Sequence, residues 1–511
     1  MFKILDCTLR DGGYYTNWDF TKELVSTYLQ STNNLPVDYL EIGYRSKAMK
    51  AYHGKYFYSP VYELEAIRKT SNKKIAIILD EKDVPPADVD ELLSPCVGLV
   101  DMVRIALAPQ RLKEGLLLAA EVKKLGFEVC FNAMYMSKWQ QYPDFINGLK
   151  ELNGLADYFY MVDSYGGVYP DEVKKTMDII RAETDCKIGF HGHNNLELAL
   201  INSLTAIEYG ADIIDATILG MGRGAGNLKT ELLLTVLNSK YNLPVDFNAV
   251  GNAVDGFKEL MEQYHWGTNV PYMISGTNSL PQKEVMDWVT TRLYSFNSII
   301  RALQNQRNNI KDNQKFELFK PAARHKKVLI IGGGPSATEH AEAVKQFINA
   351  ADDICLIHAS SKNAAPYKDI PVDQYYCLVG SEGDRLEKAI TNLSDFRGTC
   401  ILPPYPRKMG TYVPAQVIDK AFEIEKIDFT DKVNDSHAVL ALQAALDLGA
   451  EELYVIGYDG YTTSINEVQM TLITENEHLF GEFESFTGIR LQSLTPTRYK
   501  KLSVSSIYTF I

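Results

Sequence analysis

Two short stretches, far apart in the chain, carry residue types that bind metal ions. Arg10 and Asp11 follow an apolar run and precede two glycines, which predicts that they lie where a strand passes into a loop. His191 and His193 end a second apolar run, and alternate residues of a strand point to the same side. One carboxylate and two imidazoles would form a facial ligand set with open positions for a chelating substrate. The plainer alternative is that these are ordinary polar residues at strand ends.

Eight apolar runs must position these residues. Most are followed by amphipathic stretches of helical length, and together they occupy residues 1 to about 240, which predicts a parallel (β/α)8 TIM barrel in an α/β protein. In such a barrel the polar residues at the carboxyl ends of the strands converge on one mouth. The residues expected at that mouth are Asp11, Glu41, Arg104, Asn132, Asp163, His191 and His193.

Composition limits the classes of partner. The 511 residues, 46% hydrophobic and 23% charged, are typical of a soluble globular protein. No apolar run approaches the roughly 20 residues that cross a bilayer, and no secretory signal is recognisable. Seven cysteines without a CxxC pair favour reduced thiols, and a net charge of −13 disfavours nucleic acid. We therefore expect a cytoplasmic protein that binds neither membrane nor nucleic acid.

Three motifs resemble those of the DRE-TIM metallolyase superfamily, the HMG-CoA lyase-like proteins. The superfamily includes the 4-hydroxy-2-oxovalerate aldolases, 3-hydroxy-3-methylglutaryl-CoA lyase, and the isopropylmalate and homocitrate synthases. The motifs are residues 8–12, residues 191–196 and residues 215–227. The glycine loop Gly220–Asn227 and the pair Asp163-Ser164 are most similar to the oxovalerate aldolase branch. The resemblance covers about the first 300 residues.

The resemblance implies a divalent metal bound by Asp11, His191 and His193, with Asn227 a further ligand and Arg10 beside the developing enolate oxygen. A cation and a guanidinium would stabilise such an enolate, and a 2-oxo acid such as pyruvate can chelate a metal. Mixed oxygen and imidazole ligands suit Mn²⁺ or Mg²⁺, with Co²⁺ or Zn²⁺ as alternatives. We expect an aldolase or lyase that makes or breaks a C–C bond of a 4-hydroxy-2-oxo acid, with an aldehyde as the second partner.

The residues expected to contact that substrate are Glu41, Arg104, Asn132 and Asp163. The general base is less clear from the sequence, because the aldolase branch is expected to carry a histidine three positions after the aspartate, where this chain has Tyr14. A phenol with a pKa near about 10 is a weaker base at neutral pH unless its surroundings lower that pKa. Tyr14 is therefore a candidate for proton transfer or for substrate contact, with Tyr15, His53 and a metal-bound water as alternatives.

Two other functions stay open. One is a Claisen-type synthase or lyase acting on acyl-CoA, although the glutamate that synthase branches carry just after Asp-Gly is absent. The other is a non-catalytic barrel whose C-terminal module does the binding. Retention of Arg10, Asp11, His191 and His193 together speaks against that second alternative.

The C-terminal part shows a new α/β pattern. We place the barrel and its appended helices in residues 1–300, a polar linker in 301–325, and a Rossmann-like domain in 326–511. Gly332, Gly334 and Ser336 lie in a glycine-rich turn after a strand, which could receive a phosphate of a nucleotide or nucleotide-sugar. The acid that would hold an NAD ribose is absent from the second strand. The domain could also stabilise an assembly, and we expect a homo-oligomer.

Overall fold

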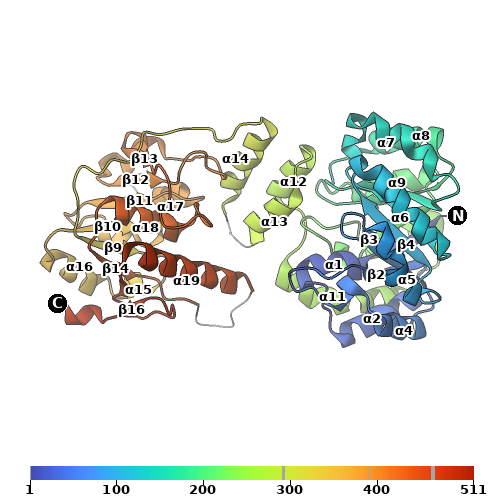
Figure 1. The fold of residues 1–511 in the computed structure, drawn as a ribbon, viewed down its shortest axis with the longest axis horizontal. Helices are drawn as coiled ribbons and strands as arrows, with labels where there is room; N and C mark the ends of the chain where they lie inside the picture. Colours follow the sequence, from blue (N-terminus) through green and yellow to red (C-terminus); the bar gives the residue numbers. More distant parts are fainter. Residues whose placement is uncertain (1, 291–293, 391, 462–466) are drawn as a thin grey trace. The chain divides into compact units, whose positions relative to one another are not determined.

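The computed structural model describes residues 2–290, 294–390, 392–461 and 467–511. The chain divides into two compact units, Met1–Met286 and Asp287–Ile511. Each unit is described separately below (Figure 1).

Unit 1 is a closed barrel of eight parallel strands, which confirms the predicted TIM barrel. Each strand pairs with the next along the chain, and β8 pairs with β1 to close the ring. The strands are β1 (Lys3–Asp6), β2 (Tyr39–Tyr44), β3 (Lys74–Asp80), β4 (Met102–Leu107), β5 (Glu128–Ala133), β6 (Tyr158–Asp163), β7 (Lys187–Gly192) and β8 (Ile213–Ala216).

Helices surround the barrel, and the apolar residues on their inner faces form one buried cluster with the outward-facing residues of the strands. The helices of unit 1 are α1 (Thr8–Thr16), α2 (Lys22–Asn33), α3 (Lys55–Tyr58), α4 (Val61–Thr70), α5 (Val89–Leu93), α6 (Leu112–Lys124), α7 (Pro143–Gly148), α8 (Pro170–Glu183), α9 (Ala199–Glu208), α10 (Thr230–Tyr241), α11 (Phe247–Tyr264) and α12 (Val270–Thr277). The next helix, α13 (Gln282–Thr290), includes the boundary between the two units. A second, smaller cluster that includes Leu5, Met102 and Tyr160 fills the barrel interior.

Arg10 and Asp11 lie in a helix, so the expectation of a loop at these residues is wrong. The α1 helix includes both of them and continues through the two glycines. A Cβ added at Gly13 would lie 2.1 Å from the Trp18 ring, which explains the glycine. Glycine lowers helix propensity by about 1 kcal/mol relative to alanine. Close packing against Trp18 therefore requires glycine at position 13, although the sequence analysis took the two glycines as a sign of a loop.

The buried carboxylate of Asp6 ties the ends of the barrel together. Asp6 accepts hydrogen bonds from the Thr8 backbone N–H (3.0 Å), the Tyr28 hydroxyl (2.6 Å) and the Thr230 hydroxyl (2.6 Å). These partners belong to α1, α2 and α10 respectively. The end of the first strand is thus bonded to both the first and the last helices of the ring.

Unit 2 is a parallel eight-stranded sheet with the order β13-β12-β11-β10-β9-β14-β15-β16. The order reverses between β9 and β14, as in doubly wound α/β sheets. The strands are β9 (Lys327–Ile331), β10 (Ile354–His358), β11 (Gln374–Cys377), β12 (Thr399–Leu402), β13 (Ala421–Glu423), β14 (Glu452–Ile456), β15 (Leu491–Ser493) and β16 (Ser503–Val504).

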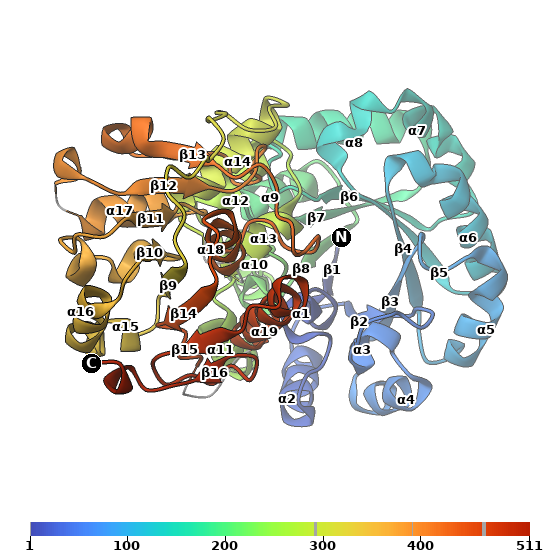
Figure 2. The ribbon, with the colours of Figure 1, turned by 60° about the vertical axis from the view of Figure 1, so that its left-hand side comes forward.

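Both faces of this sheet are buried by helices (Figure 2). Val328 and Ile330 pack with residues of α18 and α19, whereas Leu329 and Ile331 pack with residues of α16 on the other face. The helices of unit 2 are α14 (Phe296–Arg307), α15 (Ser336–Glu339), α16 (Ala341–Ala350), α17 (Glu382–Ala389), α18 (His437–Asp447) and α19 (Glu467–Thr487). Within the described residues, none of the helices of either unit is both long and apolar enough to span a membrane.

The region expected to be a linker is part of unit 2. The unit boundary falls after Met286 and not at residue 300, and α14 lies in unit 2, where the Ser298 hydroxyl donates to the Gly380 carbonyl at 3.0 Å. Asp312 is only 5% exposed and pairs with Arg407 at 2.8 Å. Because Arg407 pairs with this carboxylate, Asp312 is buried although it lies in the polar segment that was predicted as a linker.

Candidate active site

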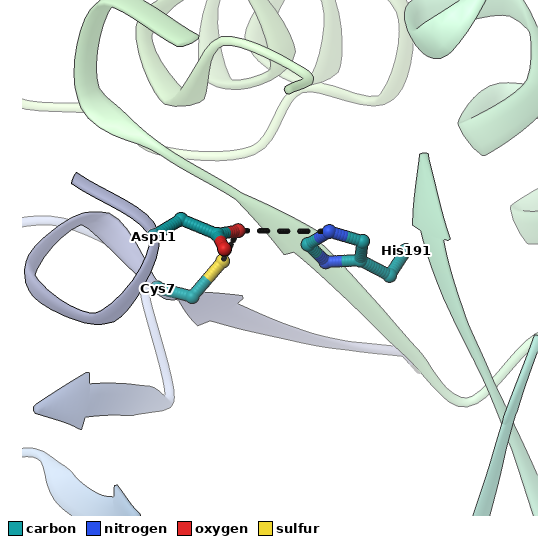
Figure 3. A group of neighbouring side chains, drawn as sticks. All are labelled: Cys7, Asp11 and His191. Atoms are coloured by element: carbon teal, nitrogen blue, oxygen red, sulfur yellow. Dashed lines mark hydrogen bonds and ion pairs between the residues drawn. The ribbon is translucent and has the colours of Figure 1, made fainter. Parts of the chain in front are cut away.

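The four residues expected to bind a metal come together at the carboxyl end of the barrel. Asp11 lies on α1, His191 lies near the end of β7, and His193 forms an isolated bridge with Asn227. The Asn227 amide donates to Asp11 Oδ2 at 2.7 Å, and His191 Nε2 lies 3.6 Å from the same oxygen (Figure 3). Cys7 joins the group, and ligand atoms of Cys7, Asp11 and His191 all lie within 4.8 Å of one another.

Both imidazoles are oriented by contacts of Nδ1. His191 Nδ1 lies 2.8 Å from Asp215 Oδ2, and His193 Nδ1 lies 2.8 Å from the Asp163 carbonyl. Metal-binding histidines usually engage one ring nitrogen in this way and bind the ion through the other. Desolvation, the neighbouring His191 and the charge of Arg223 lower the pKa of His193 to about 3, so this ring is neutral at physiological pH.

The remaining donor atoms fit a divalent cation. Burial alone would raise the pKa of Asp11, but Arg10, the two histidines and the Asn227 amide outweigh burial and lower it, so the carboxylate is ionised. Asn227 Oδ1 is buried and has no hydrogen-bond partner in the described part of the chain. Burial and nearby carboxylates raise the pKa of the Cys7 thiol well above its usual range, so Cys7 contacts Asp11 as a thiol. A carboxylate, two imidazoles and a free amide oxygen are suitable ligands for Mn²⁺ or Mg²⁺.

Arg10 is held in place by two carboxylates. Its Nη1 contacts Asp11, and its Nε donates to Glu41 at 2.8 Å. Arg104 approaches Glu41 from the other side, at 3.1 Å. Glu41 and Arg104 are fully buried and do not line the cavity. The expectation that these two residues contact the substrate is therefore corrected: the pairing of their charges keeps them beneath the site, where they position Arg10.

The same network reaches the first histidine. Arg104 Nη2 pairs with Asp215 at 2.6 Å, and Asp215 in turn holds His191. The network therefore runs from Asp11 to His191 through alternating charges and contains one more carboxylate than guanidinium groups. A bound divalent cation would offset this excess negative charge.

A cavity of about 90 Å³ opens above this network. Of the other two expected substrate contacts, Asn132 lines the cavity and Asp163 does not. The Asp163 carboxylate instead accepts backbone N–H groups of Gly167 and Val168, both at 3.2 Å, and burial raises its pKa to about 6. The lining residues are Arg10, Asp11, Tyr14, Tyr44, Ile78, Asp80, Ala106, Asn132, Met134, Tyr135, Val162, Ser164, His191, His193 and Arg223.

Tyr14 faces this cavity. Its hydroxyl lies 3.1 Å from the Tyr44 hydroxyl, and the Arg223 guanidinium lies 5.1 Å from the centre of its ring. Sequence reasoning missed Tyr44, Arg223 and Asp215 as residues of the site. Arg223 was detectable as a cation at the variable position of the glycine loop, whereas Asp215 lies within an apolar run and gave no signal of its own.

The glycine turn of unit 2 binds a carboxylate of the chain itself. The Ser336 backbone N–H donates to Asp459 at 3.0 Å, and its hydroxyl donates to the same carboxylate. The carbonyls of Gly332 and Gly334 accept from the Asn363 side chain, at 2.9 and 2.8 Å. Asp459 thus occupies the position at which a phosphate was expected, because the turn lies at the switch point beside the end of β14. This geometry argues against nucleotide binding by Gly332, Gly334 and Ser336.

Comparisons with known proteins agree with this barrel site. The HMGL-like family model matches residues 117–254. A 4-hydroxy-2-oxovalerate aldolase of Thermomicrobium roseum is 32% identical over 46% of this chain and 66% of its own length. An oxaloacetate decarboxylase of Mycobacterium tuberculosis is 27% identical over 49% of this chain and 74% of its own length. The chain belongs to the HMGL-like (DRE-TIM) family.

A solved structure is more similar in sequence. The crystal structure of the N-terminal domain of an aldolase candidate from Bacteroides vulgatus is 58% identical, with a TM-score of 0.57, and covers 59% of this chain and 100% of its own. Together with the names of the curated relatives, family membership supports a lyase or aldolase kind of function for the barrel.

Proposed function

We propose that the barrel is a divalent-metal-dependent aldolase that makes or breaks the C3–C4 bond of a 4-hydroxy-2-oxo acid, with pyruvate and an aldehyde as the two halves. The observation that carries the proposal is the convergence of Asp11, His191 and His193 beside Arg10 in one cavity. Asn227 contacts Asp11, and its Oδ1 has no hydrogen-bond partner among the described residues. Asp11, His191, His193 and Asn227 would hold the ion, with Mn²⁺ or Mg²⁺ favoured. When bound, the metal would supply a Lewis acid for the 2-oxo group.

Arg10 stabilises the negative charge of the pyruvate enolate in this scheme. Two of its nitrogens are engaged by Asp11 and Glu41, which fixes the plane of the guanidinium while other N–H groups stay available to the cavity. Preorganised donors of this kind are effective because they need no reorientation when charge develops. The same arrangement would serve cleavage and condensation.

The proton of the C4 hydroxyl must leave during cleavage, and a proton must return to C3 of the enolate. The hydroxyls of Tyr14 and Tyr44 are 3.1 Å apart beside the cavity, so one proton can pass between their oxygens. Burial raises the pKa of Tyr44 well above its usual range, which keeps Tyr44 protonated as a donor. We therefore assign Tyr14 to the reacting hydroxyl and Tyr44 to its support.

The size of the cavity favours a short substrate. A volume of about 90 Å³ is well below the roughly 300–1,000 Å³ of sites for drug-sized ligands. Decarboxylation of oxaloacetate is the second candidate, because it yields the same pyruvate enolate and a relative carries that name. A Claisen reaction would instead release free thiol from acetyl-CoA in the presence of a 2-oxo acid.

Substitution of the metal ligands tests the proposal. Asp11→Asn and His191→Ala should each lose stoichiometric Mn²⁺ and lower pyruvate release from a 4-hydroxy-2-oxo acid by about 100-fold or more, because second-shell changes alone cost about 10- to 100-fold. Metal content is read by elemental analysis and pyruvate by mass spectrometry. Asp185→Asn, an exposed aspartate in the loop before β7, is the matched control and should leave both unchanged. Wild-type protein that binds no metal would contradict the proposal.

A further inference from the structure

Arg223 differs from the other arginines of the barrel. In the described part of unit 1, the guanidiniums of the other six arginines donate to a carboxylate or a carbonyl, and that of Arg223 has no such acceptor. The six are Arg10, Arg45, Arg68, Arg104, Arg111 and Arg181. Arg223 is half-buried and lines the cavity of the proposed aldolase site. A partly desolvated cation without a counter-ion costs free energy, which an anionic ligand would recover.

The loop that carries Arg223 is rigidly attached. The Arg223 carbonyl accepts the Gly226 backbone N–H at 3.2 Å. The neighbouring Gly224 carbonyl accepts both the Tyr15 hydroxyl and the Gly267 N–H, each at 3.2 Å. The side chain is therefore presented from a fixed backbone, and its guanidinium covers the Tyr14 ring at 5.1 Å. A contact with an aromatic ring provides no oxygen acceptor, so the N–H groups of Arg223 stay available for a ligand.

The position of Arg223 indicates which half of the substrate it meets. The enolate half is bound at Arg10 and the metal ligands, where the guanidinium of Arg10 is already paired with Asp11 and Glu41. Arg223 lies instead on the wall formed with Tyr14, close enough to His193 to affect its charge. Tyr14 is the residue assigned to the reacting C4 hydroxyl, so Arg223 adjoins the aldehyde half.

The negative charge of Asp80, which lines the same cavity as Tyr14, is already balanced by a lysine. The Asp80 carboxylate pairs with Lys82 at 2.8 Å. Arg223 therefore remains the cation of the cavity wall that has no protein counter-ion among the residues the structure describes.

We propose that Arg223 forms an anion subsite, and that the aldehyde partner of the reaction carries a carboxylate or phosphate group that binds it. This inference rests on the proposed aldolase function and specifies its substrate class. The reaction balances as an ordinary aldol addition: C3 of pyruvate loses a proton and bonds to the aldehyde carbon, and the resulting alkoxide gains a proton. No oxidant or further reactant is needed. The anionic group of the aldehyde takes no part in bond making and serves for binding.

Matched aldehydes test the subsite. Each pair consists of an anionic aldehyde and a neutral analogue. Glyoxylate is paired with acetaldehyde to test a carboxylate, and glycolaldehyde phosphate is paired with glycolaldehyde to test a phosphate. For each pair, kcat/KM of each aldehyde is measured with pyruvate and Mn²⁺. The kcat/KM of the anionic aldehyde is divided by that of the neutral one, and this ratio is compared between the wild-type protein and its variants. Comparing ratios removes the intrinsic reactivity of each aldehyde.

Arg223→Gln should lower that ratio by about 10- to 100-fold in one pair, mainly through KM of the anionic aldehyde, because a charge-assisted hydrogen bond is lost. The pair that responds identifies the anionic group. Arg223→Lys keeps the charge and should restore part of the ratio. Lys113→Gln removes the same charge from an exposed position on α6 and should leave both ratios unchanged.

Exchange of the pyruvate methyl protons in D₂O distinguishes a failure of the anion subsite from a failure of the proposed function, because the exchange needs the enolate site and no aldehyde. If wild-type protein and Arg223→Gln both catalyse Mn²⁺-dependent exchange and neither ratio changes, the anion subsite is wrong while the proposed function stands. If wild-type protein catalyses no exchange, the proposed function falls and takes the subsite with it. A reduced ratio with exchange retained supports both.

Discussion

Each unit buries an arginine between two carboxylates, and the two arginines differ in what surrounds them. In unit 2, Arg407 pairs with Asp312 at 2.8 Å and with Glu423 at 3.0 Å. Its Nε also donates to the Thr411 hydroxyl, and its two Nη atoms donate to the carbonyls of Pro403 and Gln314. The charge is satisfied on every side, so this cluster is structural.

The corresponding cluster in the barrel contains buried oxygen atoms that lack hydrogen-bond partners among the described residues. Arg104 pairs with Glu41 and Asp215, but Glu41 Oε1 and Asp215 Oδ1 are buried and have no hydrogen-bond partner among the residues that the structure describes. Asn227 Oδ1, in the same site, is also buried without a hydrogen-bond partner among the described residues. Because unsatisfied buried polar atoms are rare in native proteins, their concentration beside Arg10 distinguishes a functional site from a structural ion pair.

Removal of each arginine is the most direct test of the difference between the two clusters. Arg104→Met and Arg407→Met should each lower the free energy of unfolding of their unit by about 3–5 kcal/mol, because each removes the guanidinium that lies between two buried carboxylates. Only Arg104→Met should also weaken Mn²⁺ binding, by about 10- to 100-fold, since Asp215 orients His191. Denaturant unfolding and metal titration measure the two effects. Equal metal affinity in both variants would contradict the distinction.

Acid pH should reveal a structural carboxylate in unit 2. Burial would raise the pKa of Glu382, but His437, Arg385 and the Ser361 N–H outweigh burial and lower it to about 2. A lowered folded-state pKa contributes stability that is present above the unfolded value near about 4.5 and is lost as the pH falls toward 2. We expect a loss on the order of 3 kcal/mol over that range, measured by denaturation at several pH values. In Glu382→Gln this part of the loss should be absent.

Two glycines within the barrel sharpen the contrast between site and scaffold. Gly13→Ala places a Cβ against the Trp18 ring in the helix that carries Asp11, so it should destabilise by about 1–3 kcal/mol and lower metal affinity. Gly251 lies in α11 with no atom within 4 Å of an added Cβ. Gly251→Ala should therefore stabilise by about 0.5–1 kcal/mol through helix propensity, without a change in metal affinity. Thermal denaturation with and without Mn²⁺ compares them.

Much of the barrel could be predicted because its strands are short apolar runs with clear ends. Two of the eight apolar runs that predict the barrel are residues 39–44 and 74–80, and these are the observed bounds of β2 and β3. The convergence of Asp11 and His191 followed from the fold, since carboxyl ends of parallel strands share one mouth.

Other parts depend on contacts that a pattern does not reveal. The helix at Arg10 and Asp11 is closely packed at its glycines, with Trp18 beside Gly13 and Met221 beside Gly12, and local propensity does not reveal such contacts. Whether Glu41 and Arg104 face the substrate or each other depends on side-chain direction inside the barrel. The turn at Gly332 matched a phosphate-binding spacing, but its ligand, Asp459, is a carboxylate more than a hundred residues further along the chain.

The bonds made by Asp6 at the barrel seam bear on how the site comes into being. Asp11 and Asn227 are 216 residues apart, and β1 meets β8 only when the ring is complete. A nascent chain that ends before β8 already contains Asp11, His191 and His193, but it lacks Asn227 and the strand that closes the ring. Under the proposed function, ion uptake would therefore be a late event in maturation and would report that the ring has closed.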